Sequence, residues 1–238
     1  MKRNIVLVFI VLIMALACNR DPEMIQTSLV ITTVDEGGGP VSGVSVELYY
    51  SLDDWLNESS KLYETIESDI EGKASFMDID TGKYYINAYK GSSNNWETEV
   101  LKPVIEGFQN TTDITVIDNG SGLISQASGK KWILSSFFTN GGDFYEFLDD
   151  CVKDDTLIFF KGPGLGAHRT SRGSLKCTIS QEDNIDGLWT LLDDNSLLRL
   201  QFGNDIINWN IDTLKVEKLS VSYVESGNIQ NVSYIPIE

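Results

Sequence analysis

Residues 39–48 read GPVSGVSVEL, a turn-forming Gly-Pro pair followed by regular alternation. Val44, Val46 and Leu48 are apolar, and the residues between them are polar. This period of two is typical of a strand that buries one face. On the other side of the turn, residues 28–33 form a β-branched run in which Leu29, Ile31 and Thr33 share one face. The two runs therefore predict the start of a β-sheet domain.

Short runs of this kind recur through the first half of the chain, separated by Gly, Pro and Asp. Strands are expected at residues 27–33, 44–49, 62–66, 74–76, 84–89, 97–105 and 111–117. The polar segment 53–61 predicts a long loop or a single helical turn. Closely spaced short strands with turns between them indicate an antiparallel β-sandwich.

Three motifs in this half carry a family resemblance. They are GPVSGVSVEL at 39–48, EGKASF at 71–76 and TGKYYINA at 81–88. The arrangement resembles the carboxypeptidase-regulatory-like, Cna-B and transthyretin-type sandwiches of bacterial surface proteins, which implies a seven-stranded Greek-key sandwich over residues 27–118. In pilin-like members a lysine of the first strand forms an isopeptide bond, but residues 27–36 contain no lysine. That crosslink is therefore not expected here.

The second half begins after a turn-forming DNGSG segment at 118–122, which predicts a linker over residues 119–124. Residues 143–150 are polar and aromatic and suggest a short helix. Strands are expected at 131–138, 155–160, 187–192, 196–202, 205–211, 214–223 and 229–237. Consecutive strands without a long helix predict an up-and-down meander that closes into a barrel. Because each half has its own strand set, we expect each to fold alone.

The second half also resembles a known domain. Its motifs are GKKW at 129–132, CVKDDTL at 151–157, Cys177 and DGLWTL at 186–191. They are similar to the lipocalin-like domain of small bacterial lipoproteins, which implies an antiparallel barrel over residues 125–238. The glycine-rich segment 162–173 departs from the regular strand that this resemblance implies. The predicted fold class is all-β, a sandwich followed by a barrel.

The N-terminus has the features of an export signal. Lys2 and Arg3 precede an uninterrupted apolar run of 13 residues, Ile5 to Ala17. A membrane-spanning helix needs roughly 20 such residues, so the run has the length of a signal-peptide core. The following Cys18 completes a segment that resembles the lipobox of bacterial lipoproteins. The alternative is an ordinary secretory signal followed by a chance cysteine.

The lipobox resemblance implies cleavage after residue 17 and acyl chains, palmitate among them, on Cys18. Residues 18–26 would then be a tether. Asn19 follows the cysteine, so the inner-membrane retention signal of some lipoproteins is absent. Asp21 and Glu23 resemble surface-export signals. The expected localisation is the outer membrane, with lipid anchoring, and the exposed leaflet stays open.

The composition and net charge of the chain exclude some classes of protein and of binding partner. The chain has 238 residues, of which 42% are hydrophobic and 22% charged, so neither a disordered nor a membrane-embedded protein is expected. Lys and Arg number 18 against 35 Asp and Glu, a formal net charge of -17. Nucleic acid is therefore not an expected partner, because phosphate binding depends on basic surface.

The three cysteines are expected to have two different roles. With Cys18 assigned to lipid, Cys151 and Cys177 remain, and disulfides persist in exported proteins. We predict a disulfide between them. Two free thiols are the alternative, and a metal site is disfavoured because the spacing is far from C-x-x-C.

No arrangement of residues points to catalysis. His168 is the only histidine, in a segment that reads as a loop or edge strand, and no G-x-S-x-G or H-E-x-x-H motif is present. Adjacent acids occur at 53–54, 149–150, 154–155 and 193–194. They suit solvated turns better than calcium binding or glycoside hydrolysis. No catalytic residue, metal or cofactor is predicted.

The tryptophans have two expected roles. Trp132, Trp189 and Trp209 fall in alternating runs and are expected to pack in the barrel. Trp55 and Trp96 lie in polar segments, where they would either contact a sugar or protein partner or fold back on the sandwich.

The preferred hypothesis is a non-catalytic, lipid-anchored binding module whose ligand is a small apolar molecule, a glycan or a partner protein. A carboxylate-dependent hydrolase such as a glycosidase and a purely structural spacer are the alternatives. Two acids converging in a cleft would favour the hydrolase. A wide apolar barrel mouth would favour binding, and a fully packed barrel would favour the spacer.

Overall fold

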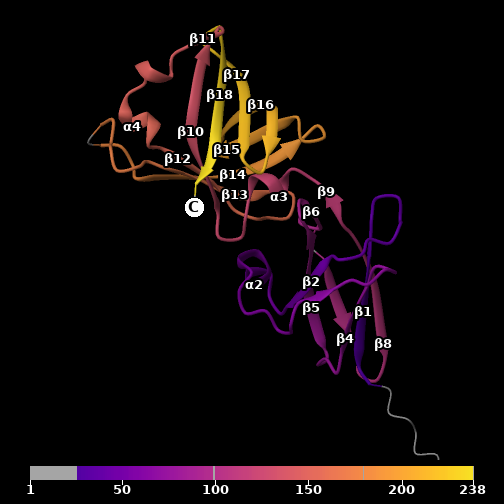
Figure 1. Cartoon of the computed structure of the whole chain (residues 1–238). Helices are drawn as coiled ribbons and strands as arrows, with labels where there is room; N and C mark the ends of the chain where they lie inside the picture. The colour runs from indigo at the N-terminus through magenta and orange to yellow at the C-terminus, as the bar shows by residue number, and fades with distance from the viewer. Residues whose placement is uncertain (1–25, 99, 179, 238) are drawn as a thin grey trace, which may run out of the picture.

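The computed structural model of the chain describes residues 26–98, 100–178 and 180–237. Strands account for 53% of the chain and helices for 8%, so the predicted all-β class is confirmed. The order of the two parts, a sandwich and then a barrel, is also confirmed (Figure 1). Within the described residues, no helix has the length and apolarity needed to span a membrane.

Two sheets form the N-terminal sandwich. The first has the order β4 (Lys73–Met77), β1 (Ser28–Val34), β8 (Gln109–Thr115). The second has the order β3 (Ile66–Glu67), β2 (Ser45–Tyr49), β5 (Gly82–Lys90), β6 (Ser93–Asn94), β9 (Ile117–Asp118), with β7 (Leu101–Val104) also paired to β5. The pairing of β1 with β8 is parallel, unlike the antiparallel arrangement expected. No hairpin joins these two strands, so nothing forces them to run in opposite directions.

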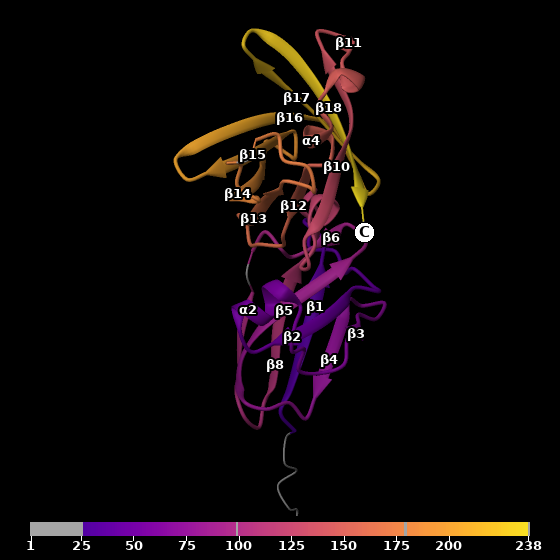
Figure 2. The same cartoon turned by 90° about the vertical axis from the view of Figure 1, so that its left-hand side faces the viewer.

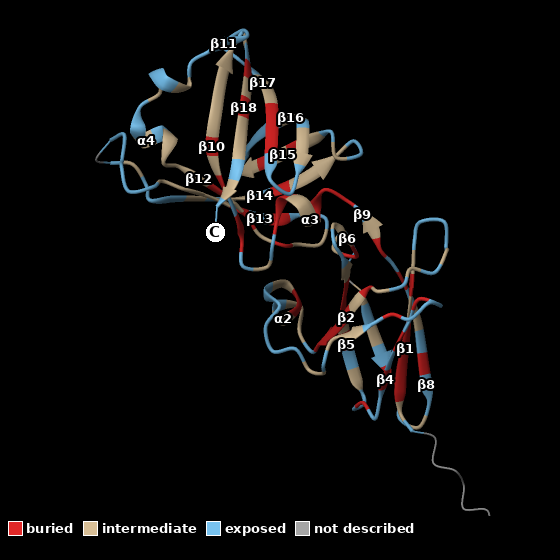
Figure 3. Cartoon of the chain, viewed as in Figure 1, coloured by how far each residue is buried: buried red, intermediate tan, exposed pale blue. Residues whose placement is uncertain are grey.

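The alternation seen in the sequence fills the space between the two sheets. Buried residues concentrate on β1 and β2 (Figure 3). The core contains Leu29, Ile31, Val44, Val46, Leu48, Ala74, Phe76, Ile79, Tyr84, Ile86, Ala88, Val104, Ile114 and Val116. Of the expected strand at 62–66, only residue 66 pairs, in the two-residue β3.

The polar segment after β2 forms the single helical turn that was one of two expectations. The Ser51 hydroxyl accepts a hydrogen bond from Asp54 N at 3.0 Å and caps α2 (Leu52–Asn57). A capping hydroxyl satisfies one of the free N–H groups at a helix start. The helix ends at Glu58, whose φ of 50° is left-handed.

The segment expected as a linker is helical and joins the barrel core. It forms α3 (Ser121–Ile124), and Ile124 is fully buried in the barrel cluster. A Cβ on Gly120 would lie 2.6 Å from a methyl carbon of Leu214. Only glycine fits this close approach without a shift of its neighbours.

Eight antiparallel strands close the barrel. In order they are β10 (Lys130–Thr139), β12 (Thr156–Phe159), β13 (Gly166–Ser171), β14 (Asn184–Leu192), β15 (Leu197–Phe202), β16 (Asp205–Lys215), β17 (Lys218–Glu225) and β18 (Asn228–Ile237). The pairing of β18 with β10 completes the closure, and Figure 2 shows the two strands side by side. The short β11 (Gly142–Asp143) pairs with the far end of β10, and η1 (Tyr145–Phe147) and α4 (Asp150–Lys153) follow.

The glycine-rich segment 162–173 contains a complete strand, which the sequence reading did not predict. β13 pairs with β12 on one side and β14 on the other. Gly166 is required because Trp189 covers it, and a Cβ there would lie 2.1 Å from the indole Nε1. His168, expected in a loop or edge strand, is instead buried inside the barrel, between Phe159 and Phe202.

Candidate functional site

The barrel contains a cavity of about 480 Å³ that opens to solvent. This volume lies within the roughly 300–1,000 Å³ of small-molecule sites. Most of its wall is apolar. The lining residues are Leu134, Val152, Asp155, Leu157, Thr170, Arg172, Ile185, Leu200, Phe202, Asp205, Ile207, Trp209 and Tyr234.

Strand alternation and register bring these residues together. Leu157, Thr170 and Ile185 are register partners across β12, β13 and β14, so they form one row of the wall. Leu200 faces Ile207 in the same way across β15 and β16. Side chains at every second position of a strand share a face. Most of the cavity wall is therefore built from strands.

Two aromatic rings are stacked on that of Trp209. Its ring lies 5.8 Å from that of Tyr223 and 6.2 Å from that of Tyr234, and the planes differ by 21° and 18°. Burial raises the pKa of both tyrosines, so their hydroxyls stay neutral. Trp209, expected to pack, packs on these rings and also lines the cavity. Trp132 and Trp189 are buried in the barrel core.

One ion pair interrupts the apolar wall. A guanidinium nitrogen of Arg172 contacts a carboxylate oxygen of Asp155, and both side chains are largely buried. Burial raises the pKa of Asp155, and the hydrogen bond and charge of Arg172 oppose this change. Because the pair is internally neutralised, it offers polar atoms to a ligand without adding net charge. The other charged lining residue, Asp205, is exposed.

A disulfide fastens the rim next to this ion pair. Cys151 in α4 is bonded to Cys177, with the two Cα atoms 5.3 Å apart, as the sequence predicted. Val152 from α4 lines the cavity, and so does Arg172 at the start of the segment that leads to Cys177. The bond therefore joins two parts of the chain that each supply a lining residue.

Asp154 holds the loop that leads to Cys177 through hydrogen bonds. One of its carboxylate oxygens accepts a hydrogen bond from Leu175 N at 2.9 Å and another from Ser174 Oγ at 3.3 Å. Gly173 lies so close that a Cβ on it would be 2.3 Å from this carboxylate. The acid pair 154–155 thus has a structural role, with one member holding the loop and the other paired to Arg172.

The remaining acid pairs do not line the cavity. Residues 53–54 occupy the first turn of α2, and residues 149–150 begin α4. Asp193 and Asp194 form a turn with φ values of 52° and 53°. Their geometry is that of helix starts and turns, where carboxylates are common.

His168 has an apolar environment. It is 1% exposed, and neither ring nitrogen has a hydrogen-bond partner among the described residues. Burial lowers its pKa to about 4, against a small opposing effect of Asp186. The imidazole is therefore neutral at physiological pH. No nucleophile of the described part of the chain is bonded to it, so this arrangement does not build a catalytic pair.

Trp55 and Trp96 fold back on the sandwich. The indole N–H of Trp55 donates to Ile86 O at 2.9 Å, and that of Trp96 donates to Asn87 Oδ1 at 2.8 Å. Both rings flank the ammonium of Lys161, a residue that the sequence reading did not single out. In the sequence, the one feature that sets Lys161 apart is that it directly follows the apolar run at 157–160.

The lipidation site and most of the N-terminal segment lie outside the described residues. The signal peptide 1–17, Cys18 and residues 19–25 all belong to this part. Their roles therefore stay predictions from the sequence.

Comparisons with known proteins give only distant similarities. Neither a protein family nor a curated protein matches the sequence. The chain is similar to Japanin from Rhipicephalus appendiculatus bound to cholesterol, with 10% identity and a TM-score of 0.30 over 45% of this chain and 74% of that one. A streptococcal ancillary pilin shows 9% identity and a TM-score of 0.35 over 91% of this chain and 60% of the pilin. A DUF3823 family protein from Bacteroides ovatus shows 11% identity and a TM-score of 0.29 over 89% of this chain and 97% of that one. These values are too low to place the chain in a family.

Proposed function

We propose that this chain is a lipid-anchored, non-catalytic binding protein of the cell envelope whose barrel holds a small apolar ligand. The observation that carries the proposal is the barrel cavity of about 480 Å³ with its largely apolar wall. An apolar cavity with a few polar groups is the usual form of a small-molecule site. A barrel filled with its own side chains would instead have favoured a structural spacer.

The polar groups of the cavity favour binding over hydrolysis. A glycosidase needs two carboxylic acids on either side of the scissile bond, one of them free to give a proton. Asp155 is engaged with Arg172, and Asp205 is exposed at the edge of the wall. The hydrolase alternative is therefore not adopted.

The aromatic part of the wall favours a particular kind of ligand. Of the three stacked rings, those of Trp209 and Tyr234 line the cavity. Aromatic rings in a pocket wall suit a ligand with rings of its own. The neutral ion pair of Arg172 and Asp155 would accept a hydroxyl or carbonyl group of that ligand. We therefore propose an uncharged ring compound with one polar group.

Binding is tested with N-phenyl-1-naphthylamine, a neutral apolar fluorophore. We expect its fluorescence to rise and saturate at one site per chain, and the emission of the tryptophans to fall by energy transfer to the probe. A linear, non-saturating response would contradict a discrete site.

Anchoring is tested separately. Cys18→Ser should abolish acylation and move the protein from the membrane fraction to the soluble fraction, because acyl chains supply ~0.8 kcal/mol per buried CH₂. Fractionation with metabolic palmitate labelling measures both effects. If the variant stays in the membrane fraction without label, the proposed anchor is wrong.

A further inference from the structure

A second pocket lies where the sandwich meets the barrel. Its volume is about 340 Å³, which is within the range of small-molecule sites. The sandwich supplies Tyr89 and Trp96 to its lining, and the segment that precedes β10 supplies Gln126 and Ser128. None of these residues lines the barrel cavity, so the pocket is a separate candidate site. Small-molecule sites are common at boundaries between domains.

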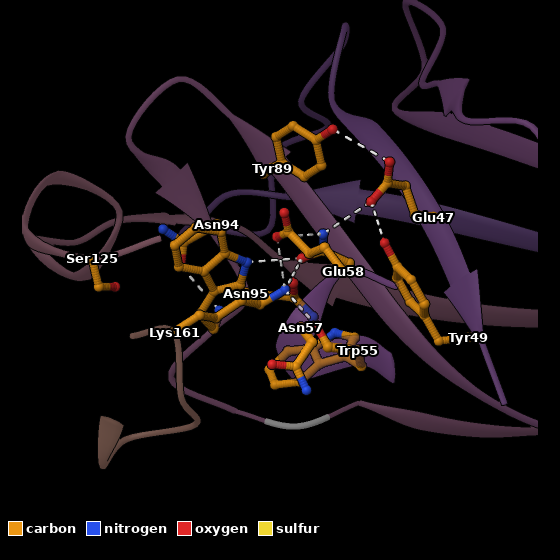
Figure 4. A network of polar contacts seen from close by, with 12 residues as sticks. Glu47, Tyr49, Trp55, Asn57, Glu58, Tyr89, Asn94, Asn95, Ser125 and Lys161 are labelled. Carbon is orange, nitrogen blue, oxygen red and sulfur yellow. Dashed lines mark hydrogen bonds and ion pairs between the residues drawn. The ribbon is translucent and has the colours of Figure 1, made fainter. Parts of the chain in front are cut away.

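The buried Lys161 holds together the two halves that form this pocket. It follows β12 of the barrel, and its side chain is 0% exposed. Its Nζ donates to three groups of the sandwich, Trp55 O at 3.0 Å, Asn87 Oδ1 at 3.0 Å and Glu58 Oε1 at 3.1 Å. Figure 4 shows this lysine network across the boundary. The wall of the pocket is therefore fixed before a ligand arrives, which lowers the cost of binding.

Two aromatic rings give the pocket an apolar surface of fixed orientation. The Trp96 indole donates to Asn87 Oδ1 at 2.8 Å, and the Tyr89 hydroxyl donates to Glu47 Oε1 at 3.4 Å. Both rings are half-buried, so each keeps part of its surface open to the pocket. A pyranose sugar has faces made of C–H groups, which pack well on a flat aromatic ring.

Polar groups complete the pocket with both acceptors and donors. The Glu58 side chain lines it and keeps 36% of its surface exposed. Within the described residues, its hydrogen bonds with Lys161 and Asn87 both fall on Oε1, which leaves Oε2 for a ligand. Two carboxamides and a hydroxyl are the other polar groups of the lining, from Asn57, Gln126 and Ser128. Such a set matches the hydroxyls of a sugar, each of which both donates and accepts.

The charge balance of the pocket favours a neutral ligand. Burial lowers the pKa of Lys161 to about 8, and the charge of Glu58 opposes the change. The amine is therefore still largely protonated at pH 7 and neutralises the carboxylate of Glu58, 3.1 Å away. The ammonium also lies 4.9 Å from the centroid of the Trp96 ring, where a cationic ligand would otherwise be attracted. Among the described residues, Glu58 alone brings a charged side chain to the lining, so an acidic ligand would meet no free cation.

We propose that the pocket between the sandwich and the barrel binds a neutral pyranose sugar. Trp96 and Tyr89 pack on the C–H face of the sugar, and the polar groups of Glu58, Asn57 and Gln126 bond its hydroxyls. A hydrocarbon ligand would leave these polar groups without partners, whereas a sugar satisfies both kinds of surface. The proposal is independent of the apolar ligand of the barrel.

Sugar binding is measured by ligand-observed NMR titrations of the purified full chain. The probes are six neutral disaccharides: cellobiose, maltose, lactose, mannobiose, xylobiose and chitobiose. We expect at least one of them to bind at a single site with a dissociation constant below about 1 mM. The lack of saturable binding for all six would overturn the proposal.

Two matched substitutions locate the bound sugar. Ala127 lines the pocket, whereas Ala167 is exposed on β13 and does not line it. Ala127→Trp should fill part of the pocket and weaken binding of the disaccharide at least about tenfold. Ala167→Trp adds the same side chain elsewhere and should leave the dissociation constant unchanged. Equal constants for the two variants would place the sugar outside this pocket and overturn the proposal.

A truncation tests the polar contacts without adding bulk. Gln126 lines the pocket and is exposed, so shortening it leaves the sandwich and barrel cores intact. Gln126→Ala removes a donor and an acceptor and should weaken binding about fivefold. Gln109→Ala, at an exposed position of β8 outside the pocket, is the control and should have no effect. Equal binding by these two variants would contradict the role of Gln126.

Discussion

Replacing Cys151 and Cys177 together by serine is expected to lower the free energy of unfolding by about 2–5 kcal/mol. The bond connects residues separated by 26 positions and encloses β12 and β13. Without it, the unfolded chain gains conformational freedom, while the folded barrel keeps its ladder hydrogen bonds. Chemical denaturation of the oxidised wild type and the double variant measures the difference.

The reduced wild type is the matched control for this experiment. It has the native side chains and lacks only the covalent bond, so its stability should agree with that of the double variant. A loss of less than about 0.5 kcal/mol in both would contradict a stabilising role, since surface substitutions alone reach that size.

Acid should destabilise the wild type more than a variant with His168→Leu. The folded-state pKa of His168 is about 4, and the unfolded value is near 6.5. Between these pH values the unfolded chain binds more protons, so stability falls as the pH falls from 6.5 to 4 and the loss levels off below that. A shift of this size corresponds to about 3 kcal/mol.

The difference in stability between the wild type and the leucine variant reports on one imidazole, because His168 is the only histidine. Carboxylates titrate in the same range, but they do so equally in both proteins. At pH 7 the leucine variant should be as stable as the wild type or more so, because it removes two buried nitrogens that lack partners among the described residues. Stability profiles that run parallel from pH 7 to pH 4 would show that His168 carries no such penalty.

The local pattern of apolar and polar residues was sufficient to predict most strands of this chain. The alternation of Val44, Val46 and Leu48 predicted β2, and the β-branched run at 28–33 predicted β1. These strands bury one face, so each carries its own periodic signal. The cysteine pair was also predictable, since export and the assignment of Cys18 to lipid left only Cys151 and Cys177.

β13 was missed because its signal is not local. Gly166 is present to admit the Trp189 ring, and Trp189 lies on the neighbouring strand. Read alone, the glycines and Pro163 predict irregular backbone. His168 was misplaced for the same reason, because its burial follows from the pairing of β13 on both sides.

The cavity and the lysine network could not be read from the sequence. Leu157, Ile185 and Ile207 converge only because the barrel closes between β10 and β18. Lys161 meets Asn87 from 74 residues away, across two separately packed cores. Periodicity gives the face of each strand but not the partner that this face meets. Sites made of distant residues therefore need the structure.

The most direct test of the binding cavity uses two neighbouring residues of β16. Both side chains are partly open to solvent, Ile206 at 56% and Ile207 at 41%, but only Ile207 lines the cavity. Ile207→Trp should fill part of the cavity and weaken the binding of N-phenyl-1-naphthylamine at least about tenfold, a loss of about 1.4 kcal/mol. Ile206→Trp adds the same side chain to the opposite face and should leave the dissociation constant unchanged. Equal dissociation constants for the two variants would show that the probe binds elsewhere, and the barrel would no longer be the site.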